Sequence, residues 1–191
     1  MKAVMISIKP KWTEKIAKGE KTIEVRKTAP KEVPFKAYIY CTKEKKQDDI
    51  IWAGIFGDRG KWNGRVIGEF ICDRIEMVNA KCSDYGIDLF YHDCLTNGCL
   101  TEREIEKYFN VPEDRDLRAM KGNGYVWNIS DLKIYDKPKE LSEFSRPCSY
   151  SGLCFSCKRT SFKKDGNLLC NTKITRPPQS WMHVEDLGEK E

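Results

Sequence analysis

The feature that most constrains the fold of this chain is the stretch of residues 19–26, which reads GEKTIEVR. The residues before it, 11–18, carry Trp12, Ile16 and Ala17 at helical spacing, and a glycine follows at a position where helices often end. We therefore expect a short helix that leads directly into a strand.

The strand predicted for this stretch has two chemically different faces. Successive side chains of a strand point to opposite sides, so Ile23 and Val25 can enter a core. The polar residues of the stretch are Lys21 at its start, and Thr22, Glu24 and Arg26 on the other face. A carboxylate between an ammonium and a guanidinium can read the edge of a nucleobase, and the two cations can bind phosphate. The alternative is a solvated strand face with an ordinary Glu–Arg pair. Because the face of Glu24 and Arg26 is predicted to lie outside the core, changing either residue is expected to cost about 1 kcal/mol or less.

Several segments resemble one known family. Residues 5–26 resemble the opening strand, helix and G-x-K-x-x-E-x-R signature of ASCH domains, which belong to the PUA-like β-barrel superfamily. The resemblance continues in residues 66–70 and 124–132, and residues 135–141 and 177–181 look like the longer ASCH proteins often carried by phages and prophages. It implies a PUA-like mixed β-barrel that binds RNA, modified bases or nucleotides.

The strand pattern is compatible with that fold. Alternating or apolar runs predict strands over residues 2–8, 35–42, 65–78 and 124–135, and a further apolar run begins at residues 50–56. The 65–78 strand is expected to bend near Cys72 and Asp73. Four or five strands with one early helix favour an α+β fold, a barrel with short flanking helices, over a doubly wound sheet.

Three regions are expected along the chain. The barrel spans residues 1–144, with an insertion at about 79–124 that covers one end or edge. The insertion contains a predicted helix over 102–109, since Thr101-Glu102-Arg103-Glu104 resembles a capping box, whereas residues 79–99 have no clean period. Residues 145–175 form a cysteine-rich segment, and the tail, 176–191, is expected to return to the barrel as a strand.

Composition narrows the class of protein without naming a function. The 191 residues, 40% hydrophobic and 33% charged, can bury one core, or one core and a small appendage. A net charge of +5 and a pI near 8.6 favour polyanionic partners mildly. No apolar run has membrane-spanning length and the first ten residues lack a signal-peptide core, so we expect a cytoplasmic protein without a membrane partner.

The predicted ligand pocket combines the signature with residues from later strands. Its expected members are Lys9, Lys21, Thr22, Glu24, Arg26, Glu69, Trp127, Asn128 and Ser130. Trp127 can either stack on a base or anchor the core, and strand parity places it on the opposite face from Asn128. Glu69, a carboxylate in an apolar strand, is either a pocket member or an exposed edge residue.

The nine cysteines predict thiol or metal chemistry rather than a disulfide framework, because their number is odd and no export signal is visible. Four of them, Cys148, Cys154, Cys157 and Cys170, lie in a segment with few large apolar residues. A structural zinc ion would supply the missing cross-link there. An iron–sulfur cluster, free thiols, or a site in which His183 replaces one cysteine are the alternatives.

A second metal site and the class of function also stay open at this stage. His92 with Cys94 and Cys99 could form another site, although buried free cysteines are the simpler interpretation. The first functional hypothesis is a module that binds RNA or a nucleotide. The second is an enzyme, because some small ASCH proteins are amidohydrolases acting on acylated cytidines with Lys, Thr and Glu.

The enzymatic hypothesis meets two departures in this sequence. Lys21, Thr22 and Glu24 would be the catalytic set, but Glu24 stands where those amidohydrolases are expected to carry the catalytic threonine. A ribonuclease activity, also assigned to some ASCH proteins, has little support from histidines, since His92 and His183 lie outside the signature. A third hypothesis is a protein-interaction module that docks through the cysteine-rich segment.

Overall fold

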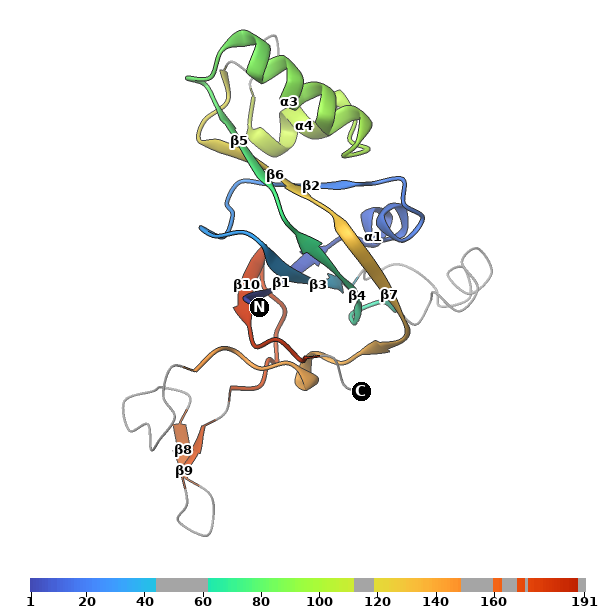
Figure 1. Cartoon of the computed structure of the whole chain (residues 1–191), viewed down its shortest axis with the longest axis vertical. Coiled ribbons are helices and arrows are strands. Elements are labelled where there is room, and N and C mark those ends of the chain that lie inside the picture. The colour runs from blue at the N-terminus through green and yellow to red at the C-terminus, as the bar shows by residue number, and fades with distance from the viewer. Residues whose placement is uncertain (44–61, 112–118, 149–159, 163–167, 171, 189–191) are drawn as a thin grey trace.

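The computed structural model describes residues 1–43, 62–111, 119–148, 160–162, 168–170 and 172–188 (Figure 1). The predicted strand that begins at residues 50–56 lies outside them. The elements, in chain order, are β1 (Ala3–Ile8), α1 (Pro10–Ala17), β2 (Ile23–Arg26), β3 (Phe35–Cys41), β4 (Val66–Cys72), β5 (Ile75–Asn79), α3 (Asp84–Thr96), α4 (Glu102–Phe109), β6 (Asn123–Asn128), β7 (Ser130–Lys139), the 3-10 turn η3 (Leu141–Glu143), β8 (Thr160–Phe162), β9 (Leu168–Cys170) and β10 (Trp181–Val184).

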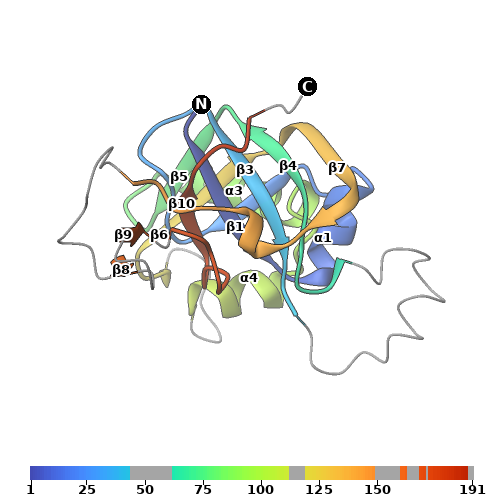
Figure 2. The same ribbon diagram turned by 90° about the horizontal axis from the view of Figure 1, so that it is seen from below.

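Two main sheets organise the described residues (Figures 1 and 2). One has the strand order β10-β1-β3-β4-β7, with β1 and β3 parallel and the other pairs antiparallel. The other has the order β2-β6-β5, and β8 and β9 form a separate hairpin. The predicted mixed α+β fold is confirmed. The finer prediction of one closed barrel is not, because the described strands divide between these sheets.

Two chain segments join the sheets, and the sequence predicted each of these segments to be a single strand. The predicted 65–78 strand is β4 and β5, which belong to different sheets, and the predicted 124–135 strand divides likewise into β6 and β7. The first break falls at Asp73, whose Oδ1 accepts a hydrogen bond of 2.9 Å from the Asn128 amide at the second break. Asp131 nearby has a left-handed φ of 47°. Both chain segments therefore turn from one sheet to the other at the same place.

The apolar side chains of the signature strand β2 pack in a cluster that is separate from those around β1. Ile23 and Val25 are buried in one cluster with residues of the insertion, among them Ile87 and Phe90 of α3 and Phe109 of α4. A second cluster lies on one face of the five-stranded sheet and contains alternate residues of β1, whereas the remaining β1 residues enter a third cluster under the tail. The predicted alternation of β2 thus places its apolar side against α3 and α4.

Helix α4 was predicted with its bounds, and helix α3 was not predicted. The α4 capping box is present, because the Thr101 side chain accepts from the Glu104 N–H and the Glu104 side chain accepts from the Thr101 N–H. In α3 the Ser83 side chain caps Gly86 N–H. No helix in the described part of the chain has the length and apolarity needed to cross a membrane.

The tail runs along the edge of the larger sheet. Strand β10 pairs with β1 antiparallel, from Ala3 opposite Val184 to Ile6 opposite Trp181. Before it, residues 144–146 and 172–174 are paired by backbone hydrogen bonds on both sides of the cysteine-rich segment. The two ends of this segment therefore lie side by side, and the tail then passes Ser7 at the end of β1.

Candidate functional site

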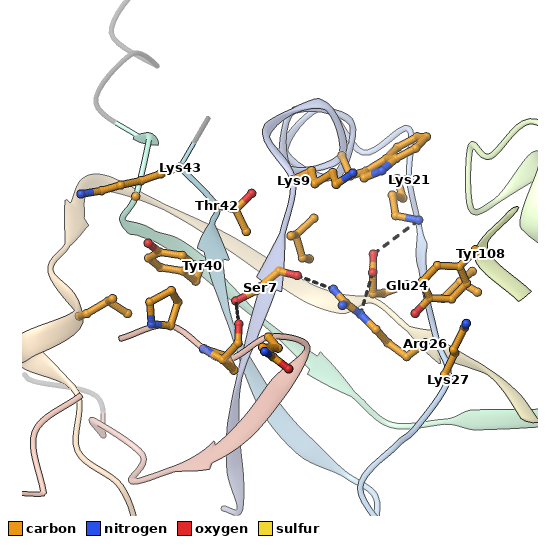
Figure 3. Close-up of a pocket in the computed structure, with 18 of the residues that line it drawn as sticks. Ser7, Lys9, Lys21, Glu24, Arg26, Lys27, Tyr40, Thr42, Lys43 and Tyr108 are labelled. Carbon is orange, nitrogen blue, oxygen red and sulfur yellow. Dashed lines mark hydrogen bonds and ion pairs between the residues drawn. The ribbon is translucent and has the colours of Figure 1, made fainter. Parts of the chain in front are cut away.

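A buried group of three charged side chains, which we call the triad, lies at the signature strand. Lys21, Glu24 and Arg26 are only 3%, 6% and 9% exposed, so the solvated strand face considered above is wrong. Lys21 Nζ lies 3.5 Å from Glu24 Oε2, and Arg26 Nε lies 3.0 Å from Glu24 Oε1 (Figure 3). With two cations and one anion, the triad has an excess positive charge in a buried environment, where unpaired charge is costly.

Backbone and tail groups hold the two cations in place. Lys21 Nζ donates a hydrogen bond of 2.8 Å to the Gly98 carbonyl. One terminal nitrogen of Arg26 donates to the Ser7 carbonyl at 2.7 Å, and the other lies 3.5 Å from Ser180 Oγ. The guanidinium therefore links β2, the end of β1 and the tail.

The hydrogen bonding of the triad is incomplete. Glu24 Oε2 and Arg26 Nε are buried and have no hydrogen-bond partner among the described residues. The Nε contact to Glu24 is close enough for an ion pair but lacks hydrogen-bond geometry. A buried polar atom without a partner costs about 1–3 kcal/mol, and a bound ligand is one of its ordinary explanations.

The triad lines a large cavity of about 1320 Å³. The end of β1 crosses it at Ser7 and Lys9. One wall comes from α4, with Tyr108 and Lys107, and another comes from residues 174–179 of the tail. Ser7 holds the tail wall, since its hydroxyl donates to the Pro178 carbonyl at 2.6 Å and its N–H to the Ser180 carbonyl at 2.9 Å. The cavity is thus bounded by both segments expected outside the central barrel.

The charge of the cavity is predominantly positive. Six of its lining residues are cationic and three are anionic. Four exposed lysines among them form no ion pair with any described residue: Lys9, Lys27, Lys43 and Lys107. Unpaired ammonium groups around a concave surface concentrate anions there.

Tyr108 is one of the cavity residues whose pKa is shifted. Burial raises the pKa of its phenol, the Arg26 guanidinium lowers it to a smaller extent, and the Glu24 carboxylate raises it. Its ring lies 5.2 Å from Lys27 Nζ. The sequence predicted the helix that carries Tyr108 but offered no signal that this helix would face the signature strand.

Four predicted pocket residues, Lys9, Lys21, Glu24 and Arg26, do line the cavity, and the other five do not. The Thr22 side chain is exposed, so the set Lys21, Thr22 and Glu24 is not brought together around the cavity. Asn128 and Ser130 are used elsewhere, by Asp73 and by the Ile71 carbonyl respectively.

Trp127 and Glu69 contact other residues of the fold and do not face the cavity. Trp127 is fully buried, and its ring makes edge contacts with Phe35 at 5.3 Å and Trp181 at 5.9 Å. Glu69 lies in β4, accepts a short hydrogen bond from Tyr135 and is 3.7 Å from Lys36 Nζ. Of the two interpretations offered for Trp127, the core anchor describes this geometry.

The predicted metal centres cannot be built from the described residues alone. Cys154 and Cys157 lie outside them, Cys170 is described only as part of strand β9, and Cys148 is an exposed free thiol. Within the described part of the chain, no group of three or more His, Cys, Asp or Glu residues could hold a metal ion. Zinc at the four-cysteine segment stays a prediction.

The cysteines of the possible second site have other surroundings. Cys94 is buried, and burial raises the pKa of its thiol to about 12. Cys99 Sγ donates to the Glu20 carbonyl at 3.2 Å. Neither cysteine forms a disulfide.

Comparison with solved structures relates the fold to a known one. A serine-to-alanine variant of ASCH from Zymomonas mobilis is similar over 96% of this chain and 88% of its own, with 16% identity and a TM-score of 0.55. ASCH from the same organism matches over 73% of each chain, with 18% identity and a TM-score of 0.49. No protein-family model matches the chain, and no curated protein does.

Proposed function

Because the chain has the fold of an ASCH domain protein, we propose that it is a binding module for RNA or a nucleotide, and that it holds a nucleobase against the triad. The fold alone does not specify a ligand. The proposal therefore rests on the site and on what the resemblance to PUA-like domains implies about ligands.

The observation that carries the proposal is Glu24 Oε2, which lies 3.5 Å from Lys21 Nζ and accepts no hydrogen bond from a described residue. An amino or imino N–H of a base would satisfy this oxygen, and a neighbouring carbonyl or ring nitrogen of the same base could accept from Lys21. Every nucleobase presents such a donor next to an acceptor along one edge. Such a buried pair should discriminate strongly between bases, because a base that does not match it leaves buried polar groups without hydrogen bonds and binds with lower affinity.

The cavity also suits the anionic part of a nucleotide. Lys9 lies beside Lys21 and Lys27 lies beside Arg26 (Figure 3), and neither lysine forms an ion pair with a described residue. Phosphate binding by such lysines is electrostatic and screened by salt. We expect affinity to fall with increasing salt, whereas the preference among bases is set by the triad and is maintained.

An amidohydrolase that uses Lys21, Thr22 and Glu24 receives no comparable support. Thr22 is exposed and does not line the cavity, so its hydroxyl cannot attack a ligand bound at the triad in this arrangement. We therefore propose binding, and leave the enzymatic reading to the test below.

The test is calorimetric titration of the purified protein with the four ribonucleoside 5′-monophosphates and with acylated cytidine, alongside chromatography of each mixture. We expect a preference for one base, changed by Glu24→Gln, which exchanges an acceptor for a donor at nearly constant size. Arg26→Lys should weaken binding although charge is kept, because an ammonium cannot contact Glu24, Ser7 and Ser180 as the planar guanidinium does.

Thermal melts of both variants provide the control for folding. If folded Glu24→Gln protein kept the parent's affinity and base preference, the triad would be a structural element and the proposal would be wrong. Release of free acid from acylated cytidine would replace it with the enzymatic hypothesis. Lys137→Ala, which removes an exposed cation outside the cavity, is the matched charge control.

A further inference from the structure

We propose that the cavity contains a second subsite, at its β3 and η3 end, which takes the neighbouring nucleotide of a single-stranded chain. This inference rests on the proposed function, since it assumes that one nucleotide is bound at the triad. It adds that the preferred ligand is a polynucleotide, and that a single nucleotide fills only part of the site.

The size of the cavity is the first observation. Its volume of about 1320 Å³ exceeds the range of about 300–1000 Å³ usual for pockets that hold one small molecule. The triad and Tyr108 occupy one end. At the other end lie Tyr40, Thr42 and Lys43, none of which has a part in base recognition at the triad (Figure 3).

At the β3 and η3 end of the cavity, the Lys43 side chain packs against the backbone of Gly64. Gly64 has a left-handed φ of 78°, and the aliphatic stem of Lys43 lies where a β-carbon of residue 64 would be. Glycine therefore provides the space in which the Lys43 stem lies against the backbone. Its ammonium forms no ion pair with any described residue, although Glu140 lines the same end and is paired 3.0 Å from Arg65.

The remaining lining suits the sugar and base of a nucleotide. Tyr40 and Ile174 are buried and give an apolar floor, and Leu141 extends it. Thr42 and Ser142 add hydroxyl groups to the same lining, and neither residue is buried. An apolar surface for a base, hydroxyls for a ribose and one cation for a phosphate are the elements of a single-strand site.

The position of Lys9 connects the two ends. Lys9 follows the end of β1. In that strand Ser7 is the register partner of Tyr40, and the Ser7 carbonyl accepts a hydrogen bond from Arg26. Lys9 is exposed and forms no ion pair with a described residue. A phosphodiester that joins two nucleotides, one at the triad and one over Tyr40, would pass this ammonium.

The test compares ribonucleoside 5′-monophosphates with the corresponding dinucleotides, at one fixed salt concentration. We expect the dinucleotide to bind at least about tenfold more tightly, as one added stacked base commonly provides. Ser142→Trp, which fills the second end from an exposed position, and Lys43→Ala should each remove most of this gain. Ser142→Trp should change mononucleotide affinity by no more than about twofold, and Lys137→Ala should leave both affinities unchanged.

Each outcome distinguishes the subsite from the function on which it rests. Equal affinity for mononucleotide and dinucleotide, or a gain that Ser142→Trp and Lys43→Ala leave intact, would overturn the subsite while mononucleotide binding still supports the triad. Absence of binding by mononucleotides and by longer single strands alike would overturn both. A loss of mononucleotide affinity in Ser142→Trp, with an unchanged melting temperature, would place one ligand across both ends and overturn the two-unit site.

Discussion

Two clusters of charged and hydroxyl side chains lie at opposite ends of strands β1 and β3, and they differ in how completely they are satisfied. The triad lies where Ser7 pairs with Tyr40, and it contains buried atoms without hydrogen-bond partners. The other cluster, which we call the clasp, consists of Lys36, Tyr38, Glu69, Tyr135 and Asp186. No buried side-chain atom of the clasp lacks a partner.

The clasp binds part of the protein itself. Tyr38 donates to Asp186 at 2.6 Å, Lys36 donates to it at 3.0 Å, and the Leu187 N–H donates back to the Tyr38 hydroxyl at 2.9 Å. The tail thus supplies the acceptor and the donor that the strands need. The triad has a cavity in the corresponding place. We infer that similar residues serve stability where the chain completes their hydrogen bonds, and recognition where a ligand must do so.

Truncation of the tail gives the largest expected effect, because it damages both clusters. A chain that ends at Cys170 loses β10, the cavity wall and the buried Ile174 and Val184. Each buried aliphatic side chain contributes about 1.5–3 kcal/mol, so together with the lost strand we expect more than about 5 kcal/mol of destabilisation. Urea unfolding measures this.

A shorter truncation separates the two clusters. A chain that ends at Glu185 loses Asp186 from the clasp but keeps β10 and the cavity wall. It should melt lower than the parent and bind the ligand with the parent's affinity. If the chain that ends at Cys170 melted like the parent, the tail would contribute nothing to the fold, and its pairing with β1 would lack energetic importance.

The next largest effect comes from removing the carboxylate of each cluster in turn. Glu24→Ala leaves Lys21 and Arg26 buried without an anion, and losing one partner of a buried pair costs about 3–5 kcal/mol. Glu69→Ala should cost less, about 1–3 kcal/mol, because Lys36 keeps its hydrogen bond to Asp186. Free energies of unfolding in urea decide the order. Equal losses would contradict the distinction between the clusters.

The sequence predicted the chemistry of the triad but not its surroundings. Alternation in residues 19–26 grouped Glu24 with Arg26 correctly, since it depends only on strand geometry. It suggested an open face, because burial depends on α4 and the tail, which are distant in sequence. Burial also raises the cost that we expect for removing Glu24 from about 1 kcal/mol to about 3–5 kcal/mol.

Other differences between expectation and structure have local causes. Residues 65–78 were expected to bend but not to change sheets, and the side-chain hydrogen bond between Asp73 and Asn128 that accompanies the change joins residues far apart in the chain. Helix α3 was missed although its buried Ile87, Phe90 and Cys94 have helical spacing, because apolar residues also occupy its exposed side. Apolar periodicity predicts a helix only when the exposed face of that helix carries polar residues.

The pH dependence of stability should report the clasp. Burial by itself raises the pKa of Asp186, but hydrogen bonds from Tyr38 and Lys36 outweigh it and leave the pKa below its usual value. A carboxyl group whose pKa is lowered in the folded state stabilises the protein fully at pH values above its unfolded pKa of about 3.9. This stabilisation is lost as the pH falls through the folded pKa. Asp186→Asn should therefore cost about 1.5–3 kcal/mol at pH 7 and progressively less below about pH 4.

The measurement is urea unfolding of parent and Asp186→Asn protein at several pH values between 7 and about 3. Asp136→Asn, at an exposed aspartate of β7, is the matched control and should give a small difference at neutral pH. A gap between parent and Asp186→Asn that stayed constant down to the lowest pH would show that the carboxylate charge of Asp186 is not what stabilises the clasp.

The smallest effect is expected at Thr22, which tests whether the triad acts with its sequence neighbour. The Thr22 side chain is exposed, whereas its backbone N–H donates to the Asn97 carbonyl and its carbonyl accepts from the Ile129 N–H. Thr22→Ala should therefore change stability by no more than about 0.5 kcal/mol and ligand affinity by less than about twofold. Calorimetry and melting of this variant beside Glu24→Gln provide the comparison. Because Thr22→Ala removes the only hydroxyl of the signature, a strong loss of binding or turnover would mean that the ligand reaches the outer face of β2, and the cavity would no longer be the site.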